Sequence, residues 1–382
     1  MENDLFNPDN IKVQMPSKVL SQNEAKITVI GVGGGGCNMI NHMIREGVHK
    51  IDLVVANTDL QALKESLAPR TLQLGPELTR GLGAGMKPEV GREAAIESIE
   101  EIKNIVEGSD IVFIAAGLGG GTGTGAASVI AQSAKEAGAL TVLVVTKPFK
   151  WEGKKRIALA QLGLDELKNV SDSHMVISND KLMNMIDENT GMQDAFRMVD
   201  NVLYQAVHGM SEIILKPGAG GVNLDFADVQ TVMQHKGMAI MGIGTAKGDN
   251  AAKKALDNAI KSPLLDEISL SGAQGVMVHW TISPNVSMFA ISNVMEHITD
   301  SIEGNPHIMF GETYDNTLNN DEVKITIVAT GFKETHCAIK EEKSTSPLDT
   351  KSSNISSTDK NYYDIPPSMR GYSIKYRLNQ SS

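Results

Sequence analysis

The feature that most constrains this chain is the alternation of short apolar segments and helical patterns between residues 26 and 180. This alternation predicts an α/β domain with a largely parallel sheet. Segments as apolar as IVFIAAG (111–117) suit strands that helices cover on both faces. The predicted strands are Ile27–Ile30, Ile51–Ala56, Ile111–Ala116, Thr141–Thr146 and Met175–Ser178. Between the second and third strands, isoleucines at every third position from Ile96 to Ile105 predict one helical face.

A second, smaller α+β domain is predicted after a long helix. The helical pattern starts at Phe196 and ends at Lys216-Pro217-Gly218, a strong stop signal. Beyond it, three further strands are predicted, with a helical pattern from Met288 to Ile302; the strands are Val276–Ser283, His307–Tyr314 and Val323–Thr330. The predicted organisation is a leader (1–25), a first domain (26–195), the central helix (196–216), the second domain (217–335), a disordered linker (336–361) and a tail (362–382).

Charge and composition exclude several classes of protein. The net charge of −11 argues against a general nucleic-acid binder, whose affinity rests on lysine and arginine. There is no apolar run long enough to predict a membrane-spanning helix, and the acidic start MENDLFNPDN does not resemble a signal peptide. Two cysteines, Cys37 and Cys337, predict no disulfide framework, so we expect a reducing, cytoplasmic environment. No histidine or cysteine cluster indicates a metal centre.

Two glycine-rich loops carry the first indication of function. Gly31, Gly33 and Gly36 match the dinucleotide fingerprint G-x-G-x-x-G, which is a weak signal on its own. The second loop, GGGTGTG (119–125), follows a predicted strand and opens a predicted helix, where free backbone N–H groups attract phosphate. A tight turn without a ligand is the alternative. We favour the phosphate loop because a run of only glycine and threonine forgoes the side-chain contacts of a structural turn.

The two loops together predict one nucleotide lying across neighbouring strand ends. A nicotinamide cofactor is the first alternative, but it requires an acidic residue at the end of the second strand, where this chain has Asn57. A P-loop of the form G-x-x-x-x-G-K-[ST] is absent from the sequence.

Five motifs in order resemble the FtsZ family, the bacterial cell-division GTPases of the tubulin superfamily. They are NTD (57–59), GLGAGMKPEVGREAA (81–95), GGGTGTG (119–125), TKPFKWEGKKR (146–156) and VNLDFADV (222–229). The resemblance covers residues 26 to about 335. It implies a Rossmann-like GTP-binding domain, a long central helix and a smaller α+β C-terminal domain.

The resemblance also implies which residues bind GTP or GDP. Glu152 is expected to bind the ribose hydroxyls and Arg156 to lie near phosphate, although the residues alone favour a simple i, i+4 ion pair. Phe196 would pack on guanine, and Asp200 would accept hydrogen bonds from its N1–H and amino group. The residues alone favour a core Phe and a solvated Asp. The loop residues implied to hold the nucleotide are Gly34, Gly35, Gly36, Cys37, Asn38, Gly121, Thr122 and Gly123.

The implied catalytic residues are Asn223, Asp225 and Asp228. Two aspartates three positions apart lie on one face at a helix start, where capping is the simpler interpretation. In the family this segment reaches into the pocket of the next subunit and positions the attacking water, with Mg²⁺ bound mainly through nucleotide phosphates and water. The resemblance therefore implies head-to-tail homopolymer filaments that form the Z ring at mid-cell.

Three features depart from the family pattern. The loop KPGAGGVNLDF is about two residues longer than the common form, so a GTP-dependent polymer with little hydrolysis is a second hypothesis. Cys37 replaces the usual Gly or Asn, either as a small tolerated side chain or as a thiol whose oxidation would block nucleotide. The segment Asp364–Arg370 resembles the peptide that docks on membrane-tethering and regulatory division proteins, but Ser368 replaces its bulky aromatic residue.

Overall fold

The structure of the chain is a computed structural model. It describes residues 25–332 except 184–185, 188, 216–221, 223, 263, 265–269, 271, 305, 316–317 and 320. The predicted leader up to residue 24, the linker, and the tail with Asp364–Arg370 lie outside the described residues. Asn223 and the preceding segment 216–221 also lie outside them.

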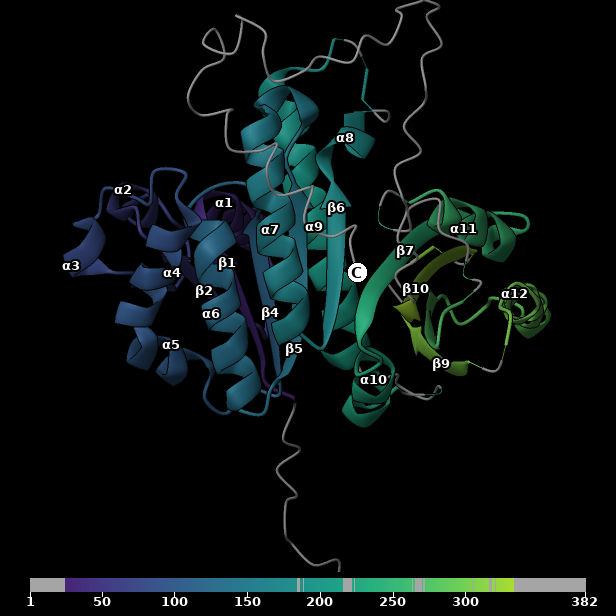
Figure 1. The fold of residues 1–382 in the computed structure, drawn as a ribbon. Coiled ribbons are helices and arrows are strands. Elements are labelled where there is room, and N and C mark those ends of the chain that lie inside the picture. The colour runs from purple at the N-terminus through teal and green to yellow at the C-terminus, as the bar shows by residue number, and fades with distance from the viewer. Residues whose placement is uncertain are drawn as a thin grey trace, which may run out of the picture. The chain divides into compact units, whose positions relative to one another are not determined.

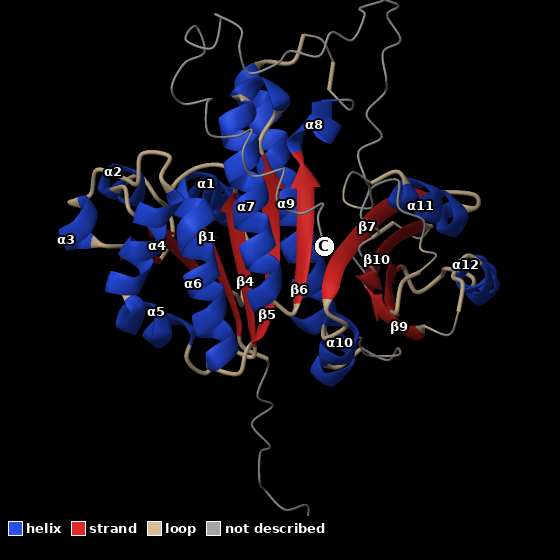
Figure 2. Ribbon diagram, in the orientation of Figure 1, coloured by secondary structure: helices blue, strands red, loops and turns tan. Residues whose placement is uncertain are grey.

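The strands of the described part form one sheet, shown in Figures 1 and 2. They are β1 (Ile27–Val32), β2 (Asp52–Asn57), β3 (Arg70–Gln73), β4 (Ile111–Gly117), β5 (Leu140–Lys147), β6 (Ser173–Ser178), β7 (Gly237–Lys247), β8 (Gly275–Ile282), β9 (His307–Tyr314) and β10 (Glu322–Phe332). Their order is β3-β2-β1-β4-β5-β6-β7-β10-β8-β9. The strands from β3 to β7 pair in parallel, whereas β10 is antiparallel to both β7 and β8.

Helices cover the parallel part of the sheet on both faces, as the apolar strands predict. On one face lie α1 (Gly33–Arg45) and the central helix α9 (Met192–Leu215). The opposite face carries α4 (Pro88–Glu97), α5 (Ile99–Val106), α6 (Thr122–Glu136) and α7 (Lys154–Val170). The shorter elements are α2 (Leu60–Lys64), α3 (Pro76–Thr79), the 3-10 turn η2 (Lys150–Glu152) and α8 (Asn179–Leu182).

The C-terminal part repeats this layering on a smaller scale. Its helix α10 (Phe226–Met233) shares one hydrophobic core with α9, and this core continues under β7, β8 and β10. The other face is covered by α11 (Ala251–Ile260) and α12 (Met288–Asp300). The two parts of the sheet are joined by only two residue pairs between β6 and β7. The predicted fold class, a mainly parallel α/β domain with a smaller α+β part, is confirmed.

The structure differs from the sequence prediction in several elements. The predicted single helix around Ile96–Ile105 is two helices, because the backbone leaves helical geometry at Ser98, whose hydroxyl accepts a hydrogen bond from Gly75 N–H at 3.1 Å. Strands β3 and β7 were not predicted. The central helix begins at Met192, four residues before the predicted start. Within the described ranges, none of the helices has the length and apolar content needed to cross a bilayer.

Candidate nucleotide site

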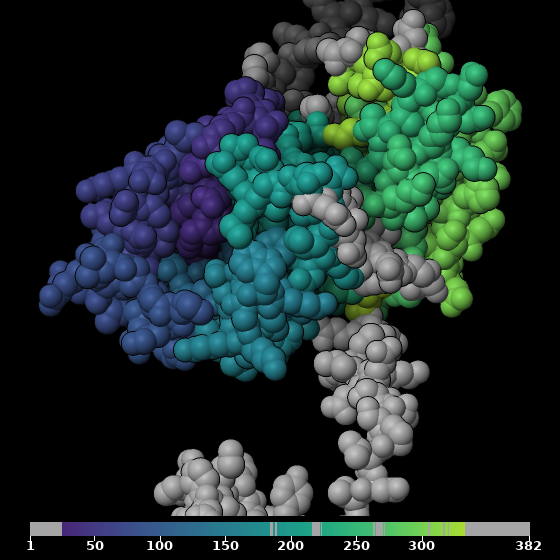
Figure 3. Space-filling view, turned by 90° about the horizontal axis from the view of Figure 1, so that it is seen from above, coloured from purple at the N-terminus to yellow at the C-terminus, as the bar shows by residue number. Residues whose placement is uncertain are grey.

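A cavity of about 320 Å³ opens where the parallel strands β1, β4, β5 and β6 end. Figure 3 looks down on this end, where purple N-terminal residues border on blue and teal segments from the middle of the chain. The cavity brings together ten residues predicted from sequence to bind nucleotide. They are Gly34, Gly35, Asn38, Gly121, Thr122, Gly123, Glu152, Arg156, Phe196 and Asp200. The edge formed by the carboxyl ends of parallel strands is where open α/β sheets bind ligands.

Two helix N-termini face the cavity. Helix α1 starts directly at the end of β1, and α6 starts a few residues after β4. Neither helix has an acidic residue in its first turn, and no side chain caps its first N–H groups. The uncompensated positive ends of both helix dipoles, together with these free N–H groups, form an anion-binding surface of the kind that holds phosphates.

The threonines of the second loop hold the loop together. The Thr122 hydroxyl lies 2.6 Å from the Thr58 hydroxyl, and Thr124 Oγ1 accepts a hydrogen bond from Gly119 N–H at 2.9 Å. Thr124 is not among the cavity residues, and Thr122 shares its hydroxyl with Thr58, so the backbone N–H groups of the loop offer the larger set of donors to a phosphate.

Two of the predicted binding residues lie behind the cavity wall. A Cβ atom on Gly36 would come within 2.6 Å of the Ala115 carbonyl oxygen, so this glycine is needed to seat α1 against β4. Cys37 is 3% exposed, and its Sγ accepts a hydrogen bond from Asn57 Nδ2 at 3.6 Å. These positions support the wall and do not line it, and a contact of either residue with nucleotide stays a prediction.

Burial raises the pKa of the Cys37 thiol to about 11, an effect that the hydrogen bond from Asn57 only partly offsets. The thiol is therefore protonated at neutral pH. Since the thiolate is the reactive form, a buried and protonated Cys37 is a poor target for oxidants and alkylating reagents. This favours the small tolerated side chain over the oxidisable thiol.

Glu152 and Arg156 line the cavity and also form an ion pair. Arg156 Nη1 lies 2.8 Å from Glu152 Oε2, and Glu152 Oε1 accepts a hydrogen bond from Phe149 N–H at 2.8 Å. Arg156 Nε is buried without a hydrogen-bond partner in the described structure. An orphaned cationic donor in a cavity is costly unless a ligand accepts from it. The ion pair can thus hold the Glu152 and Arg156 side chains in place while Arg156 Nε remains able to donate to an anion.

The first turns of α9 form the other side of the cavity. The Phe196 ring is 39% exposed and meets the buried Phe149 ring edge-on, with the ring centroids 5.6 Å apart. One turn further along α9 lies Asp200, and burial raises the pKa of its carboxyl to about 7, although the nearby Arg45 opposes this shift. A flat apolar ring beside a carboxylate can stack on a base and accept hydrogen bonds from its edge.

Asn179 is a cavity residue that the sequence reasoning missed. It follows directly after β6, is 5% exposed, and its Oδ1 is buried without a hydrogen-bond partner in the described part of the chain. Its position at the carboxyl end of a predicted parallel strand was the available signal. An unsatisfied amide in a cavity indicates a polar ligand that completes its hydrogen bonds.

The predicted catalytic aspartates do not line this cavity. They form a capping box at the start of α10, in which Asp228 N–H donates to Asp225 Oδ1 at 2.9 Å and Asp225 N–H donates to Asp228 Oδ2 at 3.1 Å. In Figure 1, α10 lies at the lower end of the molecule, whereas Figure 2 shows the arrowhead of β6 pointing to the upper end. Each carboxylate uses one oxygen for the cap and keeps the other for further contacts.

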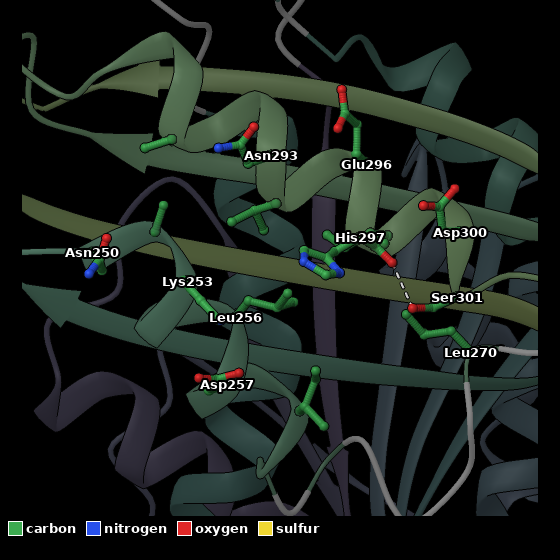
Figure 4. Close-up of a pocket in the computed structure, with 15 residues that line it drawn as sticks. Asn250, Lys253, Leu256, Asp257, Leu270, Asn293, Glu296, His297, Asp300 and Ser301 are labelled. Carbon is green, nitrogen blue, oxygen red and sulfur yellow. Dashed lines mark hydrogen bonds between the residues drawn. The ribbon is translucent and has the colours of Figure 1, made fainter.

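A larger cavity of about 670 Å³ lies between α11 and α12 (Figure 4). It contains none of the predicted site residues. Asp257, Glu296 and Asp300 line it, and this excess of carboxylates would repel phosphate. The smaller cavity at the glycine loops therefore remains the candidate nucleotide site.

The fold and the site together define a tubulin-like GTP-binding protein. A family model described as "Tubulin/FtsZ family, GTPase domain" matches residues 26–187, and one described as "FtsZ family, C-terminal domain" matches residues 237–333. The structure resembles CetZ1 from Haloferax volcanii, solved as a GDP-bound monomer, with a TM-score of 0.69 at 18% identity over 81% of this chain and 95% of that chain. This likeness shows the shared fold.

Closer relatives identify the family. The cell division protein FtsZ of Neisseria gonorrhoeae is 49% identical over 81% of this chain and 79% of its own length. FtsZ of Wigglesworthia glossinidia brevipalpis is 46% identical over 81% and 80%. A solved empty FtsZ dimer from M. jannaschii superposes with a TM-score of 0.74 at 44% identity, covering 82% of this chain and 90% of that chain. The chain belongs to the FtsZ family, the GTP-binding GTPases of cell division.

The burial of Cys37 predicts slow alkylation. In the native protein at pH 7.5, Cys37 should react with iodoacetamide at least tenfold more slowly than in urea, because the buried thiol stays protonated. Peptide mass spectrometry separates Cys37 from Cys337. Rapid native labelling of Cys37 accompanied by loss of GTP binding would restore the oxidisable-thiol hypothesis.

Proposed function

We propose that the chain hydrolyses GTP in a site that two copies share, and that this couples hydrolysis to head-to-tail assembly of filaments. One copy supplies the cavity at the glycine loops. The next copy supplies Asp225 and Asp228, which position and help to deprotonate the attacking water, and the proposed catalytic set also includes Asn223, which lies outside the described residues. Phosphoryl transfer depends mainly on positioning and charge stabilisation, which such an arrangement provides.

The observation that carries this proposal is the separation of the two halves within one chain. Asp200 lies at the cavity, and from there α9 continues to Leu215. The chain then reaches the turn Asp225–Asp228, which we call the acidic turn. These fifteen residues of helix span about 22 Å at roughly 1.5 Å per residue. The acidic turn is kept away from the chain's own nucleotide because Leu224 is buried in the core beside α10 and Val222 is hydrogen-bonded to β9, beyond the far end of this helix. A second copy is the simplest source of the missing carboxylates, and repeating this heterologous contact gives an open filament.

Within the cavity, the proposed roles follow the chemistry of each wall. The N–H groups at the starts of α1 and α6, together with Arg156, hold the phosphates, and Glu152 binds the ribose hydroxyls. Phe196 stacks on guanine. The Asp200 carboxylate accepts hydrogen bonds from guanine N1–H and the amino group, a donor pair that adenine lacks, and the Asn179 amide pairs with the remaining polar edge of the base.

The polar side chains of the cavity are compatible with a Mg²⁺ ion that binds together with the nucleotide. The described residues contain no group of three histidine, cysteine or acidic side chains that could hold a metal ion. Of the two cavity carboxylates, Glu152 is paired with Arg156 and Asp200 lies at the base end. The protein would therefore contribute little beyond second-sphere contacts, and phosphates and water would supply the ligands. When bound, the ion would neutralise charge on the transferred phosphoryl group.

In the cell, we propose that these filaments form the Z ring at the mid-cell division site on the cytoplasmic side. Through Asp364–Arg370, the tail would recruit membrane-tethering and regulatory division proteins. The M. jannaschii FtsZ, a relative of this chain, was solved as a dimer, and this supports self-association of the chain. A GTP-dependent polymer with little hydrolysis is distinguished by phosphate release: sedimentation with GTP without release of phosphate would favour it.

The raised pKa of Asp200 predicts that GTP binding weakens in mild acid. Only the ionised carboxylate accepts both guanine hydrogen bonds, and with a pKa of about 7 roughly one tenth is ionised at pH 6. The dissociation constant for GTP should therefore be about tenfold higher at pH 6 than at pH 8. Titration calorimetry measures it.

The matched control is the variant Asp200→Asn, which is offered the same nucleotide but has no carboxyl group to titrate at this position. Its GTP affinity should be low and should lose the part of the pH dependence that Asp200 causes, leaving only the effect of the nucleotide's terminal phosphate, whose second ionisation lies at about pH 6. Because an amide both accepts and donates, this variant should prefer xanthosine triphosphate, whose base offers N1–H and a carbonyl oxygen. A steep pH dependence that persists in Asp200→Asn would remove Asp200 from base recognition.

A shared site predicts that turnover per subunit rises with protein concentration. Asp228→Ala should bind GTP with unchanged affinity and lose at least a hundredfold in turnover, because its cavity is intact and its carboxylate is missing. Phosphate release across a dilution series measures both effects. Constant turnover per subunit on strong dilution, or normal turnover of Asp228→Ala, contradicts the proposal.

A further inference from the structure

The acidic turn is tied to the edge of the sheet immediately before Asp225. The backbone N–H of Glu312, on the edge strand β9, donates a hydrogen bond to the Val222 carbonyl oxygen at 2.8 Å. Two residues on, Leu224 is 5% exposed and belongs to the core that α9 and α10 share. The segment that leads into the aspartates thus pairs with β9 through its backbone and inserts a side chain beside it.

Gly311 of β9 makes room for this side chain. A Cβ atom on Gly311 would lie 2.7 Å from Leu224 Cγ and 2.8 Å from Leu224 Cδ1, closer than real Cβ contacts. Glycine in the interior of a strand otherwise weakens it, and its presence often marks the close approach of another segment. With Leu224 where it is, position 311 accepts no side chain.

A shift of Leu224 would reach the aspartates directly. Asp225 is the next residue, and the capping box joins it to Asp228 through two backbone-to-carboxylate hydrogen bonds. Behind the turn, α10 is fixed on the sheet by the buried side chains of Val229, Val232 and Met233. The acidic turn is therefore fixed at two points, by Leu224 before it and by the buried side chains of α10 after it, with few residues between them.

We propose that Gly311 is a positioning residue for hydrolysis: by admitting Leu224 against β9, it sets the register of Asp225 and Asp228 whatever the length of segment 216–221. The proposal rests on the catalytic role proposed for the two aspartates. It also explains how this chain can carry a longer loop without displacing the two aspartates. The additional residues lie before Val222, whereas the contacts that seat the turn begin at Val222, so the added length does not reach the aspartates.

The test compares GTP affinity with turnover in full-length variants. Gly311→Ala should leave the dissociation constant for GTP unchanged and lower kcat at saturating protein concentration by about tenfold or more, since a displacement near 1 Å can cost this much. Gly311→Val should lower it further. In a Leu224→Ala background, where the space is free, Gly311→Ala should have no additional effect. This non-additivity is not expected from general destabilisation.

Two controls complete the experiment. Gly209→Ala, on α9, would place a Cβ against Met241 Cε, the end of a flexible side chain on β7 and outside the contacts that seat the acidic turn, and should keep kcat within about twofold. Deleting Ala219 and Gly220 should also keep kcat within about twofold. Equal losses in Gly209→Ala and Gly311→Ala, additive effects of Gly311→Ala and Leu224→Ala, or a tenfold loss on deletion would each overturn the proposal.

Asp228→Ala separates failure of this inference from failure of the proposed function. If Asp228→Ala loses turnover while Gly311→Ala retains it, Gly311 has no positioning role and the shared site stands. If Asp228→Ala retains turnover, the catalytic role of the turn is wrong, and the positioning role falls with it.

Discussion

The rigid length of α9 is the constraint on which the rest of this structure depends. Its first turns carry Phe196 and Asp200 into the cavity, and its last turn leads toward the acidic segment. Helix hydrogen bonds and a continuous buried face, which packs into the core on the same side of the sheet as α1, keep it straight and in place. Under the function proposed above, one chain carries both halves of a hydrolytic site and holds them apart. In that proposal, assembly is a condition for hydrolysis.

Much of the fold follows from patterns that are physically strong. Strands such as β4 and β5, which are buried along almost their whole length, were predictable because burial on both faces requires continuous apolar runs. By contrast, β7 was missed because glycines interrupt its sequence, GMAIMGIGTAK, and one of them is a packing requirement. A Cβ on Gly244 would lie 1.9 Å from the Ala255 carbonyl oxygen of α11. Such contacts between distant segments leave no local signal.

The site was predictable to the extent that strand ends and helix starts define it. The glycine loops, Glu152 and Asp200 meet in one cavity, as expected. The reasoning about the glycines was only partly right, since Gly125 is required for packing: its Cβ would lie 1.9 Å from the Pro88 carbonyl oxygen. Gly36 and Cys37 were assigned to the nucleotide from the resemblance to the family's first loop, which does not distinguish the cavity wall from the layer behind it. Asn179 was missed for the opposite reason, since a lone polar residue after a strand is common.

The central claim is that the site forms between copies, and mixing two inactive variants tests it most directly. Asp228→Ala keeps the cavity, and Asp200→Ala keeps the acidic turn. If both are incorporated at random, about a quarter of the interfaces in an equal mixture join an intact cavity to an intact turn. The account predicts that phosphate release by the mixture clearly exceeds the sum of the separate variants. A mixture no more active than that sum would contradict it.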